Sequence, residues 1–155
     1  MAAGSRIVGV EGRAVREPED SRDGVQRAAG LDWERLREVG VEPCSGLDAR
    51  AAIERWRTGA EAQVWRFHVS LRRLFILVEG RGADGALLIC AVGCRRISGP
   101  FSWTTEALVA SVENGTTIVA DAAGFRLECA DVVAATGPVS TLQEIAERQD
   151  ESDGR

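Results

Sequence analysis

Hydrophobic side chains recur at every second position from about residue 62 to about residue 135, which is the spacing of β-strands that bury one face. Within this region, Leu74 to Glu79 and Ala86 to Val92 are apolar on both faces, as is typical of central strands. The pattern therefore predicts an antiparallel β-sheet, or meander, of about five to seven strands.

The first predicted strand carries a regular alternation of apolar and polar residues. The alternation assigns Trp65, Phe67 and Val69 to the buried face, and Arg66, His68 and Ser70 to the other face. A later strand is predicted to turn Phe125, Leu127 and Cys129 inward.

Turn signals divide the predicted strands. Asn114-Gly115 is typical of a two-residue hairpin loop of type I′, because both residues tolerate a positive φ. Such a loop would pair Glu113 with Thr116 and Ser111 with Ile118. Further turn or bulge signals lie at Asp84-Gly85, at Gly93, and at Gly99-Pro100, where Phe101 and Trp103 are expected to anchor the bend.

Before residue 60 the hydrophobic period is that of helices. One helix is predicted over residues 32–39, starting at Asp32 and ending at Gly40. A second is predicted over residues 46–59, with Ala49, Ala52 and Ile53 on its apolar face. A short C-terminal helix is predicted over residues 141–149. If the two N-terminal helices cover one face of the sheet, the fold class is α+β.

The chain is predicted to form a single α+β domain over residues 25–149, between a flexible N-terminal arm (1–24) and a disordered tail (150–155). The hydrophobic content of 45% and the charged content of 28% are those of a globular protein. No apolar run reaches the roughly 20 residues of a membrane span, and the first residues do not resemble a signal peptide. We therefore expect a cytoplasmic protein without membrane association.

All 19 basic residues are arginine, which indicates a GC-rich genome of bacterial type and excludes every mechanism that needs a lysine. The charge is unevenly distributed along the chain. Residues 62–105 contain six arginines against two acids, whereas the formal net charge of the whole chain is −5. This distribution indicates either a cationic sheet surface between acidic neighbours or an ordinary solvated surface whose charge varies along the chain.

Two motifs suggest a cofactor or a metal ion, and each has a simpler interpretation. The segment Gly80-Arg-Gly-Ala-Asp-Gly85 matches G-x-G-x-x-G, but a strand and not the required helix is predicted to follow, so we interpret it as a hairpin turn. Cys90, Cys94 and Cys129 with His68 are zinc-ligand types, but four residues of extended strand span roughly 13 Å. We therefore predict neither a cofactor nor a metal ion.

No arrangement of residues typical of an active site is found, so the protein is predicted not to be an enzyme. The main hypothesis is a non-catalytic protein-binding protein, of the accessory, adaptor or toxin-neutralising type, that uses an arginine-rich sheet surface. Its partner would be another protein, with homo-oligomers as a further arrangement. The candidate partner-binding residues are Arg66, His68, Arg95, Arg96 and Trp103.

Two other function classes stay open. The first is a small-molecule-binding domain or an enzyme with a pocket between helices and sheet near His68. The second is an RNA-binding module, although the acidic net charge and the inward-facing aromatic residues disfavour nucleic acid.

Overall fold

The computed structural model describes residues 33–68, 72–80 and 85–153. Within these residues the fold is α+β and mostly antiparallel sheet, with ten strands in two sheets and three helices. The large sheet contains β1 (Glu42–Ser45), β10 (Asp131–Gly137), β4 (Ala86–Val92), β3 (Arg73–Gly80), β2 (Ala60–His68) and β6 (Ser102–Thr104), in that order. The small sheet contains β5 (Arg96–Ser98), β9 (Arg126–Cys129), β8 (Thr116–Ala120) and β7 (Val109–Glu113), in that order.

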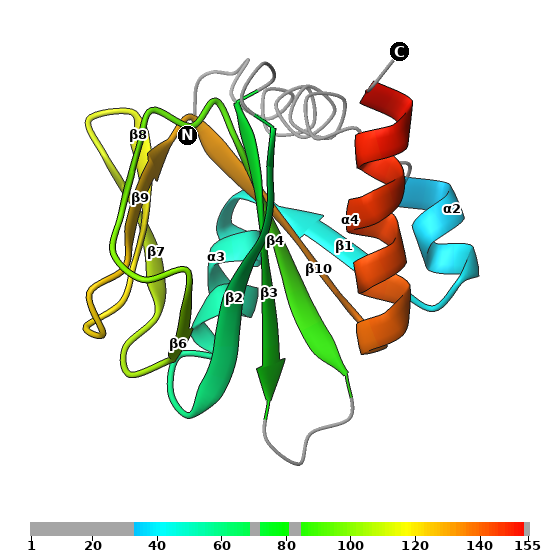
Figure 1. Cartoon of the computed structure of the whole chain (residues 1–155), viewed down its shortest axis with the longest axis horizontal. Coiled ribbons are helices and arrows are strands. Elements are labelled where there is room, and N and C mark those ends of the chain that lie inside the picture. Colours follow the sequence, from blue (N-terminus) through cyan, green and yellow to red (C-terminus); the bar gives the residue numbers. More distant parts are fainter. Residues whose placement is uncertain (1–32, 69–71, 81–84, 154–155) are drawn as a thin grey trace, which may run out of the picture.

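The helices are α2 (Trp33–Glu38), α3 (Gly46–Glu54) and α4 (Val139–Asp153). Figure 1 shows the small sheet on one side of the large sheet, with α2 and α4 on the other side. The two N-terminal helices were expected on one face of the sheet, but this expectation is wrong. The apolar face of α3 packs between the sheets, whereas Leu36 of α2 packs on the opposite face.

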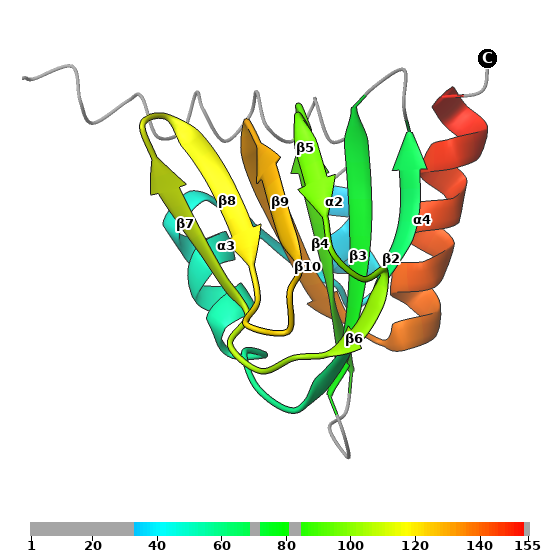
Figure 2. The same cartoon turned by 60° about the vertical axis from the view of Figure 1, so that its left-hand side comes forward.

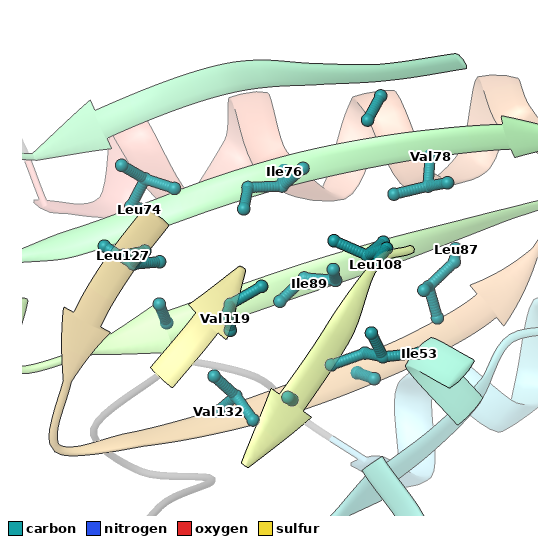
Figure 3. Close-up of a cluster of buried hydrophobic side chains, with 14 of the residues drawn as sticks. Ile53, Leu74, Ile76, Val78, Leu87, Ile89, Leu108, Val119, Leu127 and Val132 are labelled. Atoms are coloured by element: carbon teal, nitrogen blue, oxygen red, sulfur yellow. The ribbon is translucent and has the colours of Figure 1, made fainter. Parts of the chain in front are cut away.

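Two apolar clusters account for this layered arrangement. The inter-sheet cluster, shown in Figure 3, joins alternate residues of β3 and β4 to the small sheet and to Ile53 of α3. The helix-side cluster joins the other alternate residues of β3 and β4 to Leu36 and to Leu142 of α4. All seven residues of β4 are buried because both of its faces are covered, which confirms the predicted central strand.

A single meander of five to seven strands is not what the chain forms. Only β2, β3 and β4 follow one another as neighbours in the large sheet. The chain then enters the small sheet, adds β6 to the outer edge of the large sheet, and returns through β9 to β10 (Figure 2). The alternation of apolar residues predicts strands, but it carries no information about the sheet to which each strand belongs.

The passage between the sheets occurs at one corner, where β4 continues into β5 beside β9 and β10. At the predicted interruption, Gly93 has a φ of +65°, and a Cβ atom there would lie 2.8 Å from that of Ala130. The bend is held by backbone hydrogen bonds from Ala130 N–H to the Val92 carbonyl (2.9 Å) and from Arg95 N–H to the Glu128 carbonyl (2.8 Å). Bends that let strands change sheets are a general way of closing two packed sheets.

The β7–β8 hairpin confirms the turn prediction in detail. Asn114 and Gly115 both have positive φ values, and Glu113 pairs with Thr116 while Ser111 pairs with Ile118. The inward positions of Phe125, Leu127 and Cys129 are confirmed as well.

The helix boundaries match the sequence only in part. Gly40 ends α2 as predicted, through hydrogen bonds from Gly40 N–H to the Arg37 carbonyl and from Val41 N–H to the Leu36 carbonyl. The second helix ends at Glu54 and not near Gly59. The C-terminal helix spans Val139–Asp153, so it is longer than the predicted 141–149. The N-terminal arm predicted over residues 1–24 lies outside the described residues.

Candidate interaction surface

Strand β2 has two halves that differ in their surroundings. We call Ala60–Val64 its first half and Trp65–His68 its second half. The first half pairs with β3 on one side and with β6 on the other, up to the hydrogen bond from Val64 N–H to the Phe101 carbonyl (2.7 Å). For the second half, the described residues provide pairing with β3 alone. Within the part of the chain that the structure describes, the second half is therefore an open edge of the large sheet.

A β-bulge separates the two halves, because the register shifts between Val64, opposite Ile76, and Arg66, opposite Phe75. After the bulge Phe67 lies opposite Leu74, which belongs to the inter-sheet cluster, whereas Phe75 belongs to the helix-side cluster. Phe67 thus lies on the inter-sheet side of the large sheet, and Arg66 lies on the helix side.

The bulge also decides which backbone groups are directed outward. In antiparallel sheets, successive residues of a strand direct their N–H and C=O groups to opposite neighbours. In the first half of β2, these backbone groups are directed to β6 by Ala60, Ala62 and Val64. In β3, the odd-numbered residues direct their backbone groups to β2. Arg66 and His68 stand opposite such odd residues of β3. The N–H and C=O of Phe67 consequently point away from β3, toward the open edge.

Two aromatic side chains lie exposed along this edge. Phe67 is 47% exposed, although it was expected to be buried, and Phe101, which was expected to anchor a bend, is 63% exposed. For Phe67 the expectation is wrong because the bulge changes the register of the strand just before this residue. The register places Phe101 opposite Val64, on the same inter-sheet side as Phe67.

Three exposed arginines gather at the end of the large sheet where the second half of β2 ends. Arg72 directly precedes β3, and its carbonyl accepts a hydrogen bond from Cys94 N–H at 2.9 Å, which places Arg72 next to Arg95 and Arg96. We call these three residues the arginine corner. Two acidic residues near it are Glu128, which lies opposite Arg96 and is bonded to Arg126, and Asp131, which lies opposite Val92. The arginine corner is therefore a cationic part of an acidic protein.

The predicted partner-binding residues fall into three groups. Arg95 and Arg96 belong to the arginine corner, and Arg66 is exposed on the open edge. His68 is the last residue of β2, opposite Arg73, and only its backbone is described. Trp103 is 7% exposed and lies in the inter-sheet cluster, so it contributes no exposed surface. The candidate residues did not include Arg72, for which the Arg72-Arg73 pair before a strand was the available signal. They did not include Phe101 either, which was expected only to anchor the bend.

Trp103 belongs instead to a buried polar network around Asp121. The carboxylate of Asp121 accepts hydrogen bonds from the Trp103 indole N–H (2.9 Å) and from the backbone N–H groups of Glu106, Ala107 and Ala123. The Trp103 ring stacks on Phe125 at a centroid distance of 4.3 Å. Burial raises the pKa of Asp121, but these hydrogen bonds outweigh that effect and hold the pKa below its usual value. The network ties β6 and the loop after it to the turn that follows β8 of the small sheet.

The cysteines do not form a reactive or metal-binding group in the described part of the chain. All four are free thiols. Burial raises the pKa of Cys90 and Cys129 to about 12, and that of Cys94 to about 11. Among the described residues, no group of three or more histidine, cysteine or acidic side chains is arranged to hold a metal ion.

A surface pocket of about 450 Å³ lies at the other end of β2 from His68. Its walls come from the α3–β2 connection and from the ends of β3 and β10, and they include Arg55, Trp56, Thr58, Gly80 and Thr136. The pocket is wide open to solvent, and His68 lies eight positions along β2 from its Ala60, which corresponds to about 26 Å along an extended strand. It is therefore a different place from the predicted helix–sheet pocket near His68.

Comparisons with known proteins give no family: no family model, no curated protein and no solved structure matches this chain. None of the helices in the described residues has the length and apolar content needed to cross a lipid bilayer.

Proposed function

We propose that this protein is a non-catalytic protein-binding protein, and that its partner docks at the open edge of β2 beside the arginine corner. The observation that carries the proposal is the coincidence of three features at one place. An open strand edge, the exposed rings of Phe67 and Phe101, and a group of exposed arginines all lie there. Aromatic residues and arginine are enriched at protein interfaces. A partner bound to the open strand edge would also prevent the edge from pairing with other chains and aggregating.

The charge of this place indicates the chemistry of the partner. The whole chain has a formal net charge of −5, whereas the arginine corner is cationic. An acidic segment would be attracted to the arginine corner and repelled by the rest of the surface, which increases the rate of encounter and fixes the orientation of docking. Because the arginines are exposed, salt would weaken the attraction.

The coverage of both faces of the large sheet favours a protein over RNA as the partner. Modules that stack RNA bases on a sheet need an open sheet face with aromatic side chains. Here one face is covered by the small sheet and α3, and the other by α2 and α4, so Phe67 and Phe101 lie only along an edge. A strand edge offers backbone donors and acceptors, which suit another polypeptide.

An affinity-capture experiment with three forms of the protein tests this proposal. The first is the wild type, and the second carries Arg72→Glu, Arg95→Glu and Arg96→Glu. The third is a matched control that reverses three exposed or half-exposed arginines elsewhere, with Arg50→Glu, Arg55→Glu and Arg57→Glu. Wild type and control should retain the same acidic protein from the native extract at low salt, and the corner variant should lose it. A partner retained equally by all three forms, or no captured partner even after cross-linking, contradicts the proposal.

The cytoplasm is the compartment that we propose, on the sequence argument alone. The four free thiols, three of which are buried, are compatible with a reducing environment.

A further inference from the structure

The open edge of β2 defines the conformation and the side-chain pattern of the segment that occupies it. We propose that the partner binds as an added β-strand, in line with β6, whose side chains alternate between apolar and acidic. This inference rests on the proposed function and adds the form of the ligand.

The first argument for an added strand comes from the backbone hydrogen bonds of β2. The strand β6 already pairs with β2 up to the hydrogen bond between Val64 N–H and the Phe101 carbonyl. Immediately beyond it, the N–H and C=O of Phe67 point outward, so an extended segment can continue the ladder where β6 ends. Strand addition to an exposed edge gives affinity through main-chain hydrogen bonds and specificity through alternate side chains.

The second argument concerns the side chains of the added strand and comes from the two sides of the open edge. Phe67 and Phe101 lie on the inter-sheet side, so every second side chain of the added strand would lie against an aromatic ring. The intervening side chains would lie on the side of Arg66. Because successive side chains of a strand point to opposite faces, the fitting segment alternates apolar and acidic residues. The four residues of the second half span about 13 Å, which matches a core of about four or five partner residues.

Charge identifies the occupant as a different, acidic chain. A second copy that paired β2 with β2 would bring its own Arg66 and its own arginine corner to the same place, and like charges so close would oppose association. An acidic strand would instead be attracted by the arginine corner. The edge is therefore suited to a hetero-complex more than to a homodimer.

Peptide binding to the full-length protein tests the inference directly. The probe is the fluorescently labelled peptide acetyl-Glu-Val-Glu-Val-Glu-Val-Glu-amide, followed by fluorescence anisotropy at low salt. The first control has the same composition with the four Glu residues grouped before the three Val residues. The second carries N-methyl groups on the valines, and the third on the glutamates. We expect the alternating peptide to bind at least about 10-fold more tightly than the grouped peptide. We also expect one of the two N-methylated peptides to bind at least about 10-fold more weakly than the unmethylated alternating peptide.

Protein variants locate the site. Phe67→Ser and Phe101→Ser should each weaken binding of the alternating peptide by about fivefold or more. Val112→Ser is the matched control, because Val112 is half exposed on β7, an edge strand of the small sheet, and it should change nothing. Circular dichroism of each variant shows whether it is folded.

The possible outcomes separate the two proposals. Equal binding of the alternating and grouped peptides, abolished by the corner variant, would overturn strand addition and leave the acidic-partner proposal standing. Binding of no peptide below about 1 mM would also overturn strand addition, while the capture experiment decides separately on a protein partner. Stronger binding of oligouridine than of the alternating peptide would contradict both proposals in favour of RNA.

Discussion

The two halves of β2 belong to one continuous strand, yet they have opposite surroundings. In the first half, Ala60 and Ala62 are buried between β3 and β6, and the Trp103–Asp121 network holds β6 in place. In the second half, the chain bulges, the outer neighbour is missing among the described residues, and Phe67 is exposed.

The comparison shows how one strand can serve both stability and recognition. Ala60 and Ala62 of the first half pack with Trp103 of β6 in the inter-sheet cluster. The second half exposes an aromatic ring and outward backbone groups, which an isolated protein gains nothing from exposing. Substitutions that act on the first half should therefore change folding stability, and those on the second half should change binding.

Removing the Asp121 carboxylate should have the largest effect on stability. Asp121→Ala leaves the buried indole N–H of Trp103 and three backbone N–H groups without their acceptor. We expect a loss of about 3 kcal/mol in the free energy of unfolding, measured by urea denaturation. Asp121→Asn keeps one acceptor oxygen and should lose less. Wild-type stability of the alanine variant would show that β6 is not held by this network.

The corner between the sheets should be almost as sensitive. Gly93→Ala places a methyl group 2.8 Å from the Ala130 side chain at a φ of +65°, and we expect a loss of about 2 kcal/mol. Gly115→Ala is the matched control, because Gly115 also has a positive φ but no atom within 4 Å of the added methyl group. It should lose only about 1 kcal/mol, from backbone strain alone. Equal losses for both variants would contradict the close packing at the corner.

Acid should weaken the first half of β2 through the same carboxylate. The pKa of Asp121 is lower in the folded protein than in the unfolded chain, because hydrogen bonds to the charged form outweigh burial. Its contribution is therefore present above the unfolded pKa of about 3.9 and is lost as the pH falls through the folded pKa. Thermal unfolding between pH 6 and pH 2 should show a steeper loss for wild type than for Asp121→Asn. Parallel curves would assign the acid sensitivity to other groups.

Changes at the open edge should have the smallest effect on folding. Phe101→Ser removes an exposed ring that the free protein does not need, so the free energy of unfolding should change by less than about 0.5 kcal/mol. The same substitution should weaken binding of the acidic partner. A destabilisation comparable to that of Asp121→Ala would mean that Phe101 serves the fold and not recognition.

Local patterns determined what was correct in the sequence prediction. The β7–β8 hairpin followed from Asn114-Gly115 because turn chemistry alone sets its register. The central strands β3 and β4 followed from continuous apolar runs. Gly40 ended its helix as expected because the terminating hydrogen bonds are made within six residues.

Long-range pairing explains what the sequence prediction missed. Strand β1 has four residues and contains Pro43, and it forms because β10, about 90 residues later, offers an edge. The bulge in β2 has no local signal, so Phe67 was assigned to the buried face. Trp103 was assigned to the surface because its acceptor, Asp121, is 18 residues away in sequence. The arginines were recognised by their number, but their grouping depends on the contact between Arg72 and Cys94.

Amide hydrogen exchange along β2 is the most direct test of the difference between its halves. The amides of Ala62 and Val64 are bonded to β6 and should exchange slowly, close to the rate of global unfolding. The amide of Phe67 points to the open edge and should exchange orders of magnitude faster in the free protein, then become protected when the acidic strand binds. Protection of Phe67 equal to that of Val64 in the free protein would contradict the account, because the edge would already be covered.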